Sequence, residues 1–149
     1  GEPDFFAIRA GELGVPVGLV TGDQVLAEQA LALCPTAEAV VVKQALGNQS
    51  AICIPPPRAR DMIRSGAITA VSRAIEGVLV PFSGISAPYV FEVLLRKPAG
   101  EAMQANLRQL DCFELAEADR VIVTAPDMAI GFRRVAYLGY ADRPGVTRH

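Results

Sequence analysis

Histidine is almost missing from this sequence: of its 149 residues only His149, the last, is a histidine. Catalytic zinc usually takes three protein ligands, often including histidine. Ser-His-Asp and Cys-His nucleophilic sites need a histidine as well. The residues before His149 therefore cannot form a histidine-based metal centre or proton relay by themselves. His149 is interpreted as a terminal residue without a catalytic role.

Other residue types and patterns are equally sparse. The three cysteines, Cys34, Cys53 and Cys112, lie far apart and lack zinc-finger spacing. We expect them to be reduced and mostly buried, as in a cytoplasmic protein. The net charge of −2 is not the basic excess of a nucleic-acid binder. No apolar run reaches the roughly 18 residues of a membrane span, and no apolar segment follows the acidic start at Gly1–Asp4, so we expect neither a membrane partner nor a signal peptide.

Apolar residues, in contrast, are abundant. Hydrophobic types make up 51% of the sequence and charged types 20%, which is enough apolar surface for a folded core. Two unlike halves are predicted, residues 1–80 and residues 89–149. The segment 81–88 is bounded by prolines and contains Gly84, which is typical of a linker.

The first half alternates predicted helices and strands. Apolar runs without polar alternation are typical of strands buried on both faces, and apolar residues about 3.6 positions apart are typical of amphipathic helices. On these grounds we predict a short helix near Phe5–Leu13, a strand at Val15–Thr21, a helix at Val25–Leu33, a strand at Ala39–Lys43, an edge strand at Ala51–Ile54 and a helix after Pro57. This order predicts an α/β fold with a parallel sheet.

The second half is predicted to be a smaller β-α-β-β-α unit. The predicted strands are Tyr89–Leu95, Cys112–Leu115 and Arg120–Thr124, with one helix after Pro98 and a second ending near Gly139. Thr124, with Asp127 three residues later, resembles a capped start of that second helix. Few polar groups converge here, so we interpret this half as structural.

Polar side chains follow two predicted strands of the first half, where open parallel sheets bind ligands. Asp23 follows the first strand, and Lys43 and Asn48 follow the second. Together they could orient a small polar substrate. Each also has a purely structural explanation: Asp23 as the cap of the next helix, Lys43 as a solvated strand end, and Asn48 as a turn residue.

Several segments resemble the zinc-dependent D-aminopeptidase family named for a dipeptide-transport operon. The most specific is Val15-Pro16-Val17-Gly18-Leu19-Val20-Thr21-Gly22-Asp23, preceded by Gly1-Glu2 and followed by Val41-Val42-Lys43-Gln44-Ala45. Weaker similarity occurs around Ser50-Ala51, before Arg60, at Pro88–Val93 and at Thr124–Met128, so the resemblance extends over nearly the whole sequence.

The resemblance implies a role for Glu2 that its position alone does not suggest. In this family the glutamate of the Gly-Glu pair is a zinc ligand, which corresponds to Glu2 here. The family's other ligands, an Asp-x-Glu and histidines, precede that pair and have no counterpart in these residues, and neither does its catalytic histidine. The sequence departs from the family pattern at Pro3 and at Gln24, where a second aspartate is common.

The resemblance therefore implies the C-terminal portion of an aminopeptidase. Residues 1–80 would complete its catalytic α/β domain, and the complete enzyme would use two zinc ions to release N-terminal residues, D-residues among them, from short peptides. Paired metal ions polarise the scissile carbonyl and lower the pKa of a bound water. The family assembles as a homo-oligomeric ring, so we expect exposed apolar surface here. We expect residues 1–149 alone to be inactive, with no catalytic residue among them.

A second hypothesis of another class stays open. The chain could be a non-catalytic α/β module that binds a small ligand at the Gly22-Asp23 loop or mediates oligomerisation. An Asp-x-Glu and several histidines encoded just before Gly1 would favour the enzyme, and a start codon there would favour the module.

Overall fold

The computed structural model describes residues 2–47 and 49–141, with Glu2, Tyr140 and Ala141 described by their backbone alone. The chain divides into two compact units, Gly1–Gly84 and Ile85–His149. The division falls within the segment 81–88. Each unit is described by itself.

The first unit contains a small mixed sheet covered by helices. Its elements are α1 (Glu2–Glu12), β1 (Leu19–Asp23), α2 (Gln24–Leu33), β2 (Glu38–Gly47), β3 (Ser50–Cys53) and α3 (Pro56–Ile75). The strand order is β1-β2-β3. Strands β1 and β2 are parallel, as the alternation of strand and helix predicts. The edge strand β3 is antiparallel to β2 because the short connection leaves no room for a crossover.

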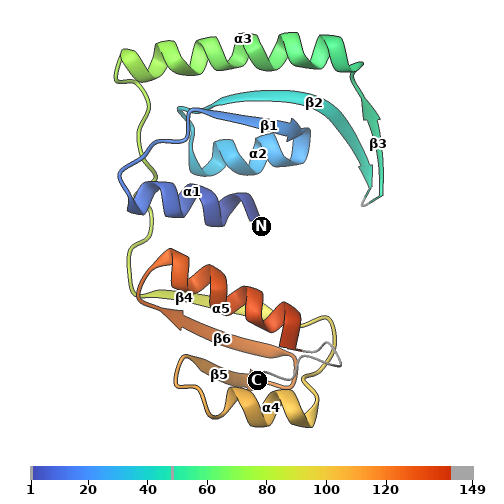
Figure 1. Ribbon diagram of the computed structural model, residues 1–149, viewed down its shortest axis with the longest axis vertical. Coiled ribbons are helices and arrows are strands. Elements are labelled where there is room, and N and C mark those ends of the chain that lie inside the picture. The colour runs from blue at the N-terminus through green and yellow to red at the C-terminus, as the bar shows by residue number, and fades with distance from the viewer. Residues whose placement is uncertain (1, 48, 142–149) are drawn as a thin grey trace, which may run out of the picture. The chain divides into compact units, whose positions relative to one another are not determined.

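Helices lie on both faces of this sheet. Figure 1 shows α3 on one side of β1 and β2, with α1 and α2 on the other. Gly66 of α3 is buried against the sheet, and a Cβ atom there would lie 2.4 Å from Cγ2 of Val40. A glycine at this position therefore lets α3 approach β2 closely. The core of this unit is built around Ala7, Cys34 and Ala37, with Val17, Leu33 and Phe82 packed against them.

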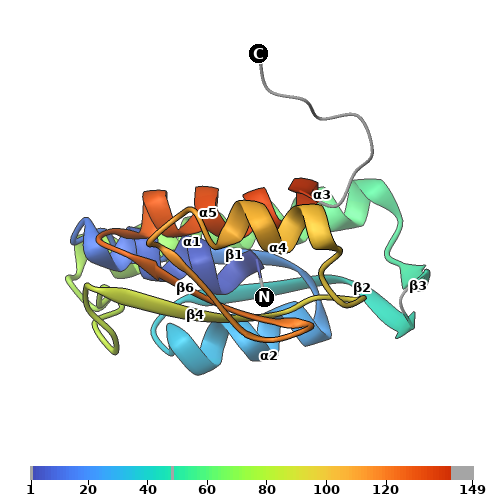
Figure 2. The same cartoon turned by 90° about the horizontal axis from the view of Figure 1, so that it is seen from below.

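The second unit has the predicted β-α-β-β-α order. Its elements are β4 (Tyr89–Leu94), α4 (Glu101–Leu107), β5 (Phe113–Glu117), β6 (Arg120–Ala125) and α5 (Met128–Ala141). The strands pair antiparallel in the order β4-β6-β5. Both helices cover one face of this sheet (Figure 2), and Met103, Leu107 and Leu138 meet Val121 and Val123 in its core.

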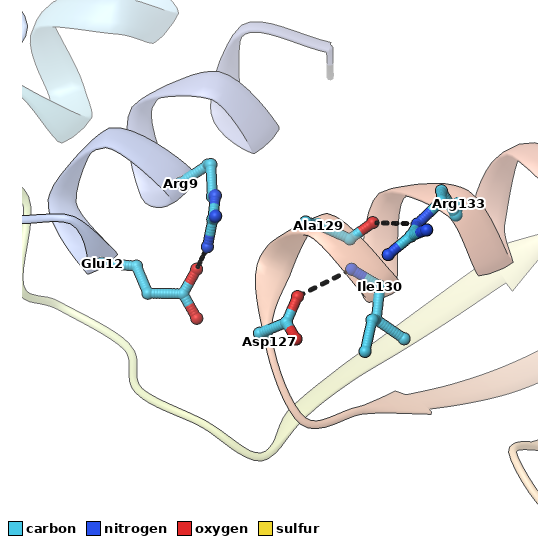
Figure 3. Close-up of polar contacts among 6 residues, drawn as sticks. All are labelled: Arg9, Glu12, Asp127, Ala129, Ile130 and Arg133. Carbon is cyan, nitrogen blue, oxygen red and sulfur yellow. Dashed lines mark hydrogen bonds and ion pairs between the residues drawn. The ribbon is translucent and has the colours of Figure 1, made fainter.

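Helix α5 begins later than the sequence predicted. Thr124 is not its cap, because β6 extends to Ala125 and pairs Thr124 with Val90 of β4. Asp127 takes the capping role instead: the backbone N–H of Ile130 donates a 2.8 Å hydrogen bond to Oδ1 of Asp127 (Figure 3). The prediction that a side chain caps the start of this helix is confirmed, but the capping residue lies three positions later than predicted.

Candidate functional site

The sequence-predicted site lies where β1 passes into α2, beside β2. Asp23 is the last residue of β1 and the N-cap of α2, and its Oδ1 accepts a 2.9 Å hydrogen bond from the backbone N–H of Leu26. The capping role that the sequence offered as an alternative is therefore confirmed. In the part of the chain that the structure describes, Oδ2 of this half-buried residue accepts no hydrogen bond. Capping thus leaves one carboxylate oxygen for another partner.

Lys43 lies directly across from Asp23 on the neighbouring strand. The register between β1 and β2 shifts after Gly22: Gly22 pairs with Val41, whereas Asp23 pairs with Lys43. Without this shift Val42 would lie opposite Asp23. Paired residues of adjacent strands share a face of the sheet, so the irregularity brings the ammonium and the carboxylate to the same face. Lys43 is exposed, and among the side chains that the structure describes it forms no ion pair with a carboxylate.

Gln24, the first residue of α2, fixes the junction between β1 and α2 to β2, a role that sequence reasoning missed. Its side-chain Nε2 donates to the carbonyl oxygen of Ala45 at 3.0 Å, and its Oε1 accepts from the Ala45 N–H at 2.9 Å. The amide side chain thus satisfies both backbone groups of a strand residue, as a neighbouring strand would. Its position next to Asp23 was visible in the sequence, but its partner, 21 residues away, was not.

The other two predicted site residues cannot be placed at this junction. Asn48 lies outside the described residues, and so does the side chain of Glu2, whose backbone begins α1. The structure therefore brings together Asp23 and Lys43, adds Gln24, and leaves Glu2 and Asn48 as predictions.

An apolar hollow lies between α1, β1 and α2, with a volume of about 480 Å³. It is lined by Pro3, Phe6, Ala7 and Ala10 of α1, by residues 16–21, and by Ala30 and Cys34. Burial raises the pKa of the Cys34 thiol above its ordinary value, so this sulfur stays protonated and is a poor metal ligand or nucleophile near neutral pH. The hollow accordingly offers packing surface rather than charge.

The described residues do not fit a zinc site by themselves. Among the side chains that the structure describes, which do not include that of Glu2, no group of three or more His, Cys, Asp or Glu is placed to hold a metal ion. The one histidine, His149, lies outside those residues. No helix among the described residues is long and apolar enough to cross a membrane.

The parallel pair with helices on both faces defines the first unit of this chain as an α/β fold. More specifically, the chain belongs to the D-aminopeptidase family, because the sequence model of that family, described as D-aminopeptidase, matches residues 1–136. No curated protein sequence matches the chain.

Among solved structures, the zinc-dependent D-aminopeptidase DppA from Bacillus subtilis, described as a self-compartmentalizing protease, has a similar fold. The TM-score is 0.77 at 22% sequence identity, and the match covers 99% of this chain and 52% of that chain. At this identity the likeness establishes the fold. The chain spans about half the length of that protein.

Proposed function

We propose that this chain is part of a zinc-dependent aminopeptidase that releases N-terminal amino acids, D-residues included, from short peptides. Its membership in the D-aminopeptidase family over residues 1–136 is the observation that carries the proposal. The similarity of fold to a zinc-dependent D-aminopeptidase supports it.

In this proposal Glu2 contributes one carboxylate to a two-zinc centre whose other ligands lie outside the described residues. Asp23 and Lys43 orient the substrate from the end of the parallel pair, together with Asn48. The unpaired Oδ2 of Asp23 suits the substrate's N-terminal ammonium, and the free ammonium of Lys43 suits a substrate carboxylate. Gln24 holds the junction of β1 and α2, where Asp23 lies, against β2. No catalytic residue is assigned to this chain.

The proposal extends to assembly and location. Large apolar side chains such as Phe6, Ile68 and Ile75 are more than half exposed, and surface of this kind is typical of interaction sites. We propose that the complete protein forms a homo-oligomeric ring in the cytoplasm, where its three free cysteines stay reduced. Light scattering on the complete protein checks the assembly, and a monomeric mass contradicts it.

The test uses the natural protein that contains these residues. We expect bound zinc by metal analysis and hydrolysis of D-Ala-D-Ala, with L-Ala-L-Ala as the comparison. Substituting Glu2→Gln should lower zinc occupancy and hydrolysis at least about tenfold, as expected for disturbing a metal site. Glu28→Gln, which removes an exposed carboxylate from α2, is the matched control and should leave both unchanged. A protein that binds no zinc and cleaves neither dipeptide defeats the proposal.

Two observations favour the second candidate, a non-catalytic ligand-binding or oligomerisation module. Within the described residues no metal-binding cluster is found, and Asp23 is engaged as a helix cap. The same experiment separates the two candidates. A zinc-free natural protein that still assembles and leaves both dipeptides intact is the module.

A further inference from the structure

A second concave site lies in the other unit, on the helix-covered side of its sheet. It is a shallow groove, widely open to solvent, with a volume of about 410 Å³. One wall is α5, whose Ile130, Arg133, Arg134 and Tyr137 fall three or four residues apart and so share one helix face. The other wall is formed by Leu110 and Phe113, which lie between α4 and β5 and at the start of β5.

The body of this groove is apolar and partly aromatic. The rings of Phe113 and Tyr137 lie 5.9 Å apart between centroids and are tilted by 41°. Both residues are half-buried, and Leu110, on the same wall as Phe113, is 41% exposed. Such a surface favours a flat aromatic or branched aliphatic group, because aromatic pairs form tilted and offset contacts with further rings.

The two arginines contribute positive charge that no carboxylate of the described residues pairs with. Nε of Arg133 donates to the carbonyl oxygen of Ala129 at 3.3 Å (Figure 3), and Nη1 of Arg134 donates to the carbonyl oxygen of Thr124. Both of these acceptors are neutral. In the part of the chain that the structure describes, no ion pair includes either guanidinium group. Both terminal nitrogens of Arg133 are left to bind an anion.

From this combination we infer that the groove binds a carboxylate attached to an aromatic or branched aliphatic group. A guanidinium group presents two parallel N–H donors that match the two oxygens of a carboxylate, and the apolar wall takes the attached group. The same chemistry occurs in a free carboxylic acid and in the C-terminal residue of a peptide. None of the groove residues belongs to the proposed peptidase centre.

Calorimetric titration of the natural protein tests this inference. N-acetylphenylalanine should bind with a Kd on the order of 1 mM, and N-acetylphenylalanine amide, which lacks the charge, should bind at least about tenfold more weakly. N-acetyl-Gly-Gly-Phe separates the two sources of the carboxylate. Binding as tight as that of the free acid assigns the groove to peptide C-termini, and no binding assigns it to free acids.

The variants locate the binding in the groove. Arg133→Gln should weaken binding of N-acetylphenylalanine about tenfold. Arg133 is chosen because its substitution keeps the hydrogen bond from Arg134 to Thr124, which could contribute to folding. Arg108→Gln is the matched control: Arg108 is an exposed arginine at the end of α4, bonded to Gln104 and outside the groove. Equal binding of acid and amide, or equal loss in Arg133→Gln and Arg108→Gln, overturns the inference.

Discussion

The two units differ in the size of the side chains that they bury. The largest fully buried side chains of the described residues, Leu107, Met128, Val121 and Val123, all belong to the second unit. The buried apolar residues of the first unit are Ala7, Ala30, Cys34, Ala37, Val40 and Ala70, none larger than valine. Full burial of a leucine or valine side chain stabilises a fold by about 1.5–3 kcal/mol, and an alanine methyl contributes less. The second unit is therefore stabilised by its own core to a greater degree than the first.

The first unit leaves several large apolar side chains in solvent. Ile75 of α3 is 82% exposed, Ile68 is 64% exposed and Phe6 of α1 is 63% exposed. A unit that buries small residues and exposes large ones lacks cover on those surfaces. The second unit also exposes large apolar side chains, Val90 at 64% and Leu94 at 68%, but unlike the first unit it fully buries large ones as well. The proposed assembly would supply cover for the first unit.

The largest expected effect tests this contrast directly. Leu107 is 1% exposed, so Leu107→Ala removes buried volume and should lower the free energy of unfolding of the second unit by about 2–5 kcal/mol. In the unassembled chain, where Ile75 is 82% exposed, Ile75→Ala should change the stability of the first unit by less than about 0.5 kcal/mol. Hydrogen exchange at the amides of β6 and β1 during urea titration reports on each unit separately. A loss below about 1 kcal/mol for Leu107→Ala contradicts the contrast.

A smaller effect is expected where the first unit is tightly packed. Gly66→Ala places a Cβ atom 2.4 Å from Val40 Cγ2, so α3 or Val40 must shift. Overpacking of this kind costs about 1–3 kcal/mol, which exceeds the roughly 1 kcal/mol that alanine gains over glycine within a helix. Ser65→Ala, at the exposed neighbouring position, is the control and should be neutral or slightly stabilising. Thermal unfolding of both variants provides the measurement. A Gly66→Ala variant more stable than the original protein would show that α3 or Val40 shifts at little cost in free energy.

Local patterns predicted most of the fold, and cross-strand pairing decided the rest. The alternation of strand and helix predicted the parallel pair β1–β2, and the second half followed its predicted order. The predicted strand start at Val15 was four residues early: β1 begins at Leu19, which pairs with Glu38 at the start of β2. Pro16 lacks the N–H of a ladder residue. The late start of α5 has a similar cause, since Thr124 is held by Val90 across the sheet.

The candidate site was less predictable because it depends on contacts between distant residues. Local sequence favours Asp23 as a helix cap, and the structure confirms it. The register shift that places Lys43 opposite Asp23 depends on how two strands pair, and the Gln24 contact with Ala45 depends on the distance between α2 and β2. No local pattern encodes either. The roles of Glu2 and Asn48 stay predictions.

The smallest expected effect separates the two roles of Asp23. Asparagine caps a helix about as well as aspartate, so Asp23→Asn should keep the hydrogen bond to Leu26 and change stability by less than about 0.5 kcal/mol, whereas Asp23→Ala should cost about 1 kcal/mol. If Oδ2 also binds the substrate ammonium, Asp23→Asn should lower kcat/KM of the natural protein for D-Ala-D-Ala about tenfold, since a charged hydrogen bond contributes about 1.5–3 kcal/mol. Full activity in a stable Asp23→Asn variant would confine Asp23 to capping and remove it from the site.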